Sequence, residues 1–78
     1  MDNIISLDKF VVPVGWQEVE LQQIEYESGG MPQLRLRIRE RSRFTVFDID
    51  LQSAERWGQA MVDWAQAQTR SQADQEQN

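Results

Sequence analysis

The spacing of apolar residues changes once along the chain, near Asp50, and this change limits the fold more than any other feature of the sequence. Before Asp50, the segment LRLRIR alternates apolar and polar residues, and RFTVFDID is rich in β-branched and aromatic residues. Both patterns are typical of strands. After Asp50, apolar or small residues recur at the spacing of one helical face. The change predicts an α+β domain in which strands precede a single helix.

Three segments before Asp50 are predicted to be strands: residues 16–26, 34–39 and 43–50. Their short connections require antiparallel pairing, so we expect a three-stranded antiparallel meander. Apolar residues of the first segment change phase, which predicts a bulge near Gln22. Residues 1–15 are predicted to form an extended N-terminal arm that ends in a turn at Pro13 and Gly15. Within this arm, residues 4–12 are a candidate fourth strand.

The helix is expected to begin after Asp50, which is a favourable N-cap residue. Its apolar stripe comprises Ala54, Trp57, Gly58, Met61, Trp64 and Ala65. We expect this stripe to cover one face of the sheet, with Trp57 and Trp64 in the core. No large apolar residue follows residue 65, so residues 69–78 are predicted to be a disordered tail. The folded domain of sheet and helix is predicted to span residues 16–68.

The segment LRLRIRERSR, residues 34–43, holds five of the seven arginines and suggests either a nucleic-acid-binding strand or a solvated face of the sheet. Pairing the apolar faces of two neighbouring strands would place Glu25 opposite Arg35 and Glu20 opposite Arg39. The formal net charge of -5 also repels polyanions. We therefore favour the solvated face and expect no nucleic-acid binding. A nucleic-acid-associated regulator is the alternative.

The composition leaves little support for catalysis, because histidine and cysteine are absent and Lys9 is the single lysine. Asp48 and Asp50 lie on one face of a strand end and can, with Glu55, be read as a magnesium or calcium site. Helix capping by Asp50 and pairing of Asp48 with a neighbouring arginine explain both residues more simply. We expect no catalytic, cofactor or metal site, and no enzyme.

Five residues are predicted to bind a partner. If Phe44 and Val46 face the helix together with the leucines of the arginine-rich strand, Phe47 and Ile49 turn to the opposite side, beside Arg35 and Arg37. The alternative is a bend of the last strand at Asp48, which would return Phe47 and Ile49 to the core of the single chain. Trp16 follows the first turn and is a candidate anchor. A 78-residue chain without disulfides gains most from extra buried area. The sequence thus predicts a small, non-catalytic interaction or accessory module that forms a homodimer and binds an unidentified protein partner.

The predicted location is the cytoplasm, without membrane association. The first residues lack the features of a signal peptide, and no apolar segment is long enough to span a bilayer. The absence of cysteine also fits a reducing compartment.

Overall fold

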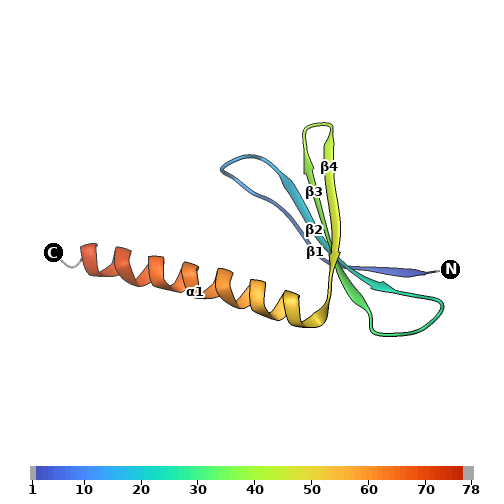
Figure 1. The fold of residues 1–78 in the computed structure, drawn as a ribbon. Coiled ribbons are helices and arrows are strands. Elements are labelled where there is room, and N and C mark those ends of the chain that lie inside the picture. Colours follow the sequence, from blue (N-terminus) through green and yellow to red (C-terminus); the bar gives the residue numbers. More distant parts are fainter. Residues whose placement is uncertain (1, 77–78) are drawn as a thin grey trace.

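Four antiparallel strands and one C-terminal helix make up the computed structural model, which describes residues 2–76 (Figure 1). The strands pair in sequence order, so the sheet is a meander. Their bounds are β1 Asn3–Val11, β2 Glu18–Glu25, β3 Gln33–Glu40 and β4 Arg43–Ile49. Helix α1 spans Leu51–Glu76. The predicted fold class is confirmed, and the candidate fourth strand in the N-terminal arm is β1.

The predicted bulge exists in the sheet, but in a different strand. Ser6 pairs with Gln22 and Asp8 pairs with Leu21, which leaves Leu7 as an extra residue in β1. Strand β2 pairs with β3 without interruption, so a bulge in β2 near Gln22 is wrong. The phase change in β2 instead places Ile24 on the other face from Leu21, where it is only 1% exposed.

A two-residue turn at Arg41 and Ser42 joins β3 to β4 and decides which side chains of β4 share a face with β3. Arg41 adopts a φ of 57°, in the left-handed region. Because the turn has two residues, Leu36 lies opposite Phe47 and Arg37 lies opposite Val46. Phe47 therefore shares the face of the leucines, and Val46 shares the face of the arginines.

Helix α1 packs against the sheet through its N-terminal part and then extends beyond it (Figure 1). A helix of 26 residues is about 39 Å long, whereas strands of 7–9 residues span about 23–31 Å. Residues 69–76, within the segment predicted to be disordered, continue the helix, and residues 77 and 78 lie outside the described part. Alanine, glutamine, arginine and glutamate, which favour helices, supply most of residues 65–76.

The core of the described chain is small. Among residues 2–74, Ile24 and Leu36 are the two that are buried. Among the helix side chains up to Asp74, only Ala54 is half-buried, and every one from Glu55 to Asp74 is exposed. A single copy of the chain consequently leaves most of its large apolar side chains in contact with solvent.

Candidate interaction surfaces

One face of the sheet is apolar and lies on the side of the helix. We call it the apolar face, and it comprises Val19, Leu21, Leu34, Leu36, Ile38, Phe47 and Ile49. The ring of Phe47 lies 6.0 Å from that of Trp57 in α1, centroid to centroid. Leu34 of the same face lines a hollow with Leu51 and Ala54 of the helix. Contacts between the helix and the sheet are thus made at this face.

The prediction that Phe47 and Ile49 lie beside Arg35 and Arg37 is wrong. Phe47 pairs with Leu36 and Ile49 pairs with Leu34, so both belong to the apolar face. The turn between β3 and β4 has two residues, and this length decides which residues of β4 share a face with the leucines of β3. Whether Phe47 and Ile49 bind a partner stays a prediction, with their neighbours now identified as apolar.

The helix carries an exposed row of large apolar side chains, although its apolar stripe was predicted to be buried against the sheet. Trp57, Met61 and Trp64 are 43%, 50% and 68% exposed. Trp57 contacts Phe47, but α1 extends beyond the sheet (Figure 1), and every described side chain from Glu55 to Asp74 is exposed. The prediction that Trp64 lies in the core of the single chain is therefore wrong. Exposed apolar rows of this size mark interaction sites.

The opposite face of the sheet carries the arginines, and three of them form ion pairs. The Arg35 guanidinium donates to the Asp48 carboxylate from two nitrogens, at 2.8 and 3.1 Å. Arg37 lies 3.8 Å from Glu20 and also over the ring of Phe44, at 5.0 Å. Arg39 pairs with Glu18 at 2.5 Å.

These pairs confirm that acidic residues of neighbouring strands neutralise the arginine row, although the predicted partners differ. Glu20 lies opposite Arg37 instead of Arg39, and Gln22 takes the place expected for Glu25 opposite Arg35. The pairing of Asp48 with a neighbouring arginine is as predicted. Phosphate oxygens would have to compete with these carboxylates for the arginines.

The two aspartates at the end of β4 have separate structural roles. Hydrogen bonds from Arg35 hold the pKa of the Asp48 carboxyl below its ordinary value, and the charge of Arg35 adds to this effect. Asp50 caps α1, since its carboxylate accepts hydrogen bonds from the Ser53 hydroxyl and the Ser53 backbone N–H. Hydrogen bonds from Ser53 likewise lower the pKa of Asp50. Both roles agree with the structural explanation predicted for these residues.

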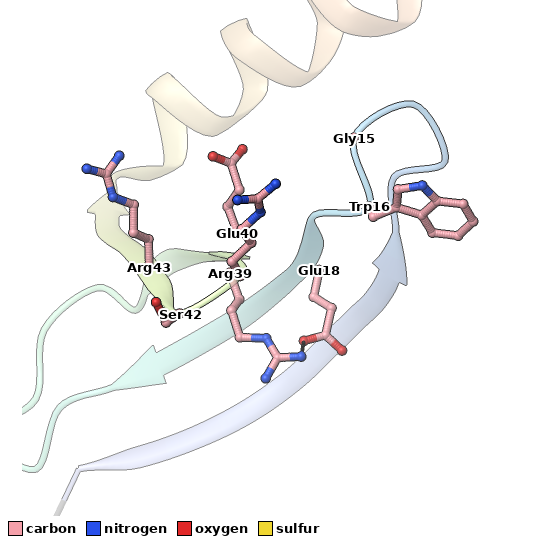
Figure 2. Close-up of a pocket in the computed structure, with 8 residues that line it drawn as sticks. Gly15, Trp16, Glu18, Arg39, Glu40, Ser42 and Arg43 are labelled. Atoms are coloured by element: carbon pink, nitrogen blue, oxygen red, sulfur yellow. Dashed lines mark ion pairs between the residues drawn. The ribbon is translucent and has the colours of Figure 1, made fainter.

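A third surface lies at one end of the sheet, where the β1–β2 and β3–β4 turns come together (Figure 2). Its hollow is lined by Gly15, Trp16, Glu18, Arg39, Glu40, Arg41, Ser42 and Arg43. The Gln17 amide donates to the Glu40 carboxylate at 3.0 Å and joins the two turns. Trp16 is 78% exposed, and its indole points away from the hollow in Figure 2. The open hollow contains no histidine or cysteine that could act as a nucleophile or base.

The five predicted partner-binding residues therefore fall into three places. Phe47 and Ile49 are on the apolar face, Arg35 and Arg37 are on the opposite face, and Trp16 is at the turns. The exposed part of the helix is not among the predicted partner-binding residues. Its signal in the sequence is the three- and four-residue spacing of the apolar stripe, a spacing that also predicts burial in the core of the single chain.

Helix α1 contains no stretch long and apolar enough to cross a membrane, and residues 2–76 include no other helix. Comparison with curated proteins gives no match, and neither does comparison with solved structures. A family model does match residues 1–67, which cover the whole sheet and the exposed apolar row of the helix. On this match, the chain belongs to DUF6967, a family of unknown function.

Proposed function

We propose that this protein is a small, non-catalytic interaction module that works as a homodimer and serves as an accessory to another protein. The observation that carries the proposal is the amount of surface that a single copy exposes. Its accessible surface is 6662 Å². A folded monomer of 9.2 kDa is expected to expose about 4,900 Å². One copy therefore exposes roughly 1,700 Å² more than a folded monomer of its size.

This excess is of the size that a stable dimer buries. A standard interface covers about 800 Å² on each partner, and obligate homodimers cover more. Much of the available surface is apolar, because Phe47 of the sheet and Trp57, Met61 and Trp64 of the helix are all exposed. The Cα radius of gyration, 16.3 Å, is also larger than the roughly 11.5 Å expected for a compact domain of 78 residues. Association with a second copy would cover the apolar face and the helix together.

The non-catalytic part of the proposal is supported by the chemistry of the ionisable side chains. Three arginines of the sheet pair with carboxylates, and Asp50 is used as a helix cap. Without histidine or cysteine, the chain lacks the usual general base and thiol nucleophile. The paired arginines also give no support to the alternative of a nucleic-acid-associated regulator. The absence of cysteine supports a cytoplasmic location.

Light scattering at tens of micromolar tests the proposal. We expect the wild-type protein to have twice the mass of one chain. Phe47→Lys should shift the mass towards that of the monomer, because it places a charge on the apolar face. Val46→Lys is the matched control, since Val46 precedes Phe47 and projects to the face of the arginines. A wild-type monomer at this concentration would contradict the proposal.

A further inference from the structure

We infer that helix α1 is the centre of the dimer and that it pairs in antiparallel orientation with α1 of a second copy. In this pair, Met61 of each chain lies against the partner's Trp57, and Ala54 lies against the partner's Trp64. The inference rests on the proposed homodimer and adds the interface, the orientation and the register. We choose a second copy as the partner because one copy exposes roughly 1,700 Å² more accessible surface than a folded monomer of its size.

The first argument is the spacing along the helix. Ala54, Trp57, Met61 and Trp64 are separated by three, four and three residues, which is the spacing of a helix-to-helix seam. Small residues flank the seam on both sides: Gly58 and Ala65 on one, Ala60 and Ala67 on the other. Small flanking residues let two helix backbones approach closely. The face opposite the seam is polar, with Gln52, Gln59 and Gln66 at seven-residue intervals.

The second argument is that the chain's own sheet covers the start of this seam and leaves Met61 and Trp64 free. Met61 and Trp64 are 50% and 68% exposed, and α1 extends beyond the sheet (Figure 1). Trp57 contacts Phe47 at one side and is still 43% exposed, so it can contact a second helix as well. A continuous apolar seam whose larger part is exposed requires a partner with a matching apolar row. A second α1 has such a row.

The orientation follows from side-chain volume. In a parallel pair, Trp57 would face Trp57 and Ala54 would face Ala54. Layers whose side chains are too large for the space between the helices would then alternate with layers whose side chains are too small to fill it. The antiparallel register places each tryptophan against a smaller residue, methionine or alanine. Packing of large against small residues fills the seam evenly. Antiparallel helix dipoles also interact favourably, and the two sheets lie at opposite ends of the pair.

The register also matches the extent of the apolar row. With Met61 beside the partner's Trp57, the two helices overlap over residues 51–67. No large apolar residue follows Trp64, so the overlap ends close to the end of the apolar row. The family match, which ends at residue 67, covers the same part of the helix. The last turns of α1 project beyond this overlap.

Distances between spin labels at four positions test the orientation and the register. The chain has no cysteine, so single cysteines at Gln52, Gln59, Gln66 and Ala73 can each be labelled specifically. These positions lie on the polar face, seven residues apart, away from the seam. At 1.5 Å per residue, the register predicts axial separations between identical labels of about 0 Å at residue 59, 21 Å at residues 52 and 66, and 42 Å at residue 73.

Pulsed dipolar measurements on the four labelled dimers should therefore give the shortest distance at residue 59, equal and longer distances at 52 and 66, and the longest at 73. Four equal distances would show a parallel pair, and a minimum elsewhere would show a different register. Either outcome would overturn this inference while the homodimer stands. A dimer mass by light scattering with no short distance at residue 59 would do the same. A monomer mass would overturn both proposals.

Discussion

Replacing Trp64 by alanine should weaken the dimer strongly without unfolding the chain. Trp64 is 68% exposed in one copy, which corresponds to about 170 Å² of a tryptophan side chain. At about 25 cal/mol per Å², complete burial of this area would contribute about 4 kcal/mol per chain. If the partner covers half of this exposed area, Trp64→Ala in both copies weakens dimerisation by about 4 kcal/mol in total. The dissociation constant should then rise by about 1,000-fold.

Sedimentation equilibrium over a wide range of protein concentrations measures this constant for the wild type and the variant. Gln66→Ala is the matched control, because Gln66 lies two residues further along the helix on the polar face. Circular dichroism should show the same helix content in both variants at concentrations where each is dimeric, since alanine favours helices. A dissociation constant for Trp64→Ala within threefold of the wild-type value would refute the reasoning, because the exposed side chain would then have no partner.

Three further predictions concern the rest of the chain. Asp48→Asn should lower stability by about 1 kcal/mol, or roughly 4–8 °C in Tm at fixed protein concentration, because it replaces the charged partner of Arg35. The lowered pKa of Asp48 means that its contribution is present above the ordinary carboxyl pKa and is lost as pH falls through the folded-state value. The difference in Tm between wild type and Asp48→Asn should accordingly shrink in acid, and a difference that persists would contradict this assignment. Deleting residues 70–78 should change Tm by no more than a degree or two, since this segment offers nothing large and apolar to bury; a larger loss would show that it docks. Fluorescence anisotropy with duplex and single-stranded oligonucleotides at physiological salt should give no dissociation constant tighter than about 1 μM, and tighter binding would reopen the nucleic-acid alternative.

Local sequence patterns predicted the elements of the fold because each pattern depends on neighbours along the chain. The change of apolar spacing at Asp50 marked the start of the helix, and the Asp50 carboxylate caps it as expected. Alternation in residues 34–39 separated the leucines from the arginines. The neutralisation of the arginines could also be predicted, because it requires only that the two strands next to β3 carry acidic residues on the same face.

Pairing between strands was harder to predict, because it depends on turn length and bulge position. The turn at Arg41 and Ser42 has two residues but lacks the Asn-Gly or Asp-Gly pair that usually marks such turns. A turn longer by one residue would place Phe44 and Val46 with the leucines, which is the arrangement predicted from the sequence. Similarly, the phase change in β2 was attributed to a bulge there, whereas the extra residue of the sheet is Leu7 in β1.

The exposure of the helix could not be read from its sequence, for a different reason. An apolar stripe has the same spacing whether it covers the sheet of its own chain or a helix of another copy. The structure was needed to show that Trp64 is 68% exposed in a single copy, on a helix that extends beyond the sheet (Figure 1).

The central claim is that a second copy covers the apolar row that one copy exposes, and the accessibility of Trp64 in solution tests it most directly. In the double variant Trp16→Phe and Trp57→Phe, Trp64 is the single remaining tryptophan and reports its own surroundings. At tens of micromolar, we expect its emission to be shifted to shorter wavelength and acrylamide to quench it several times less efficiently than in the urea-unfolded chain. Dilution to the monomer should remove this protection. If quenching at high concentration equals that of the unfolded chain, in a sample that circular dichroism shows to be folded and light scattering shows to have the dimer mass, Trp64 has no cover and the account is contradicted.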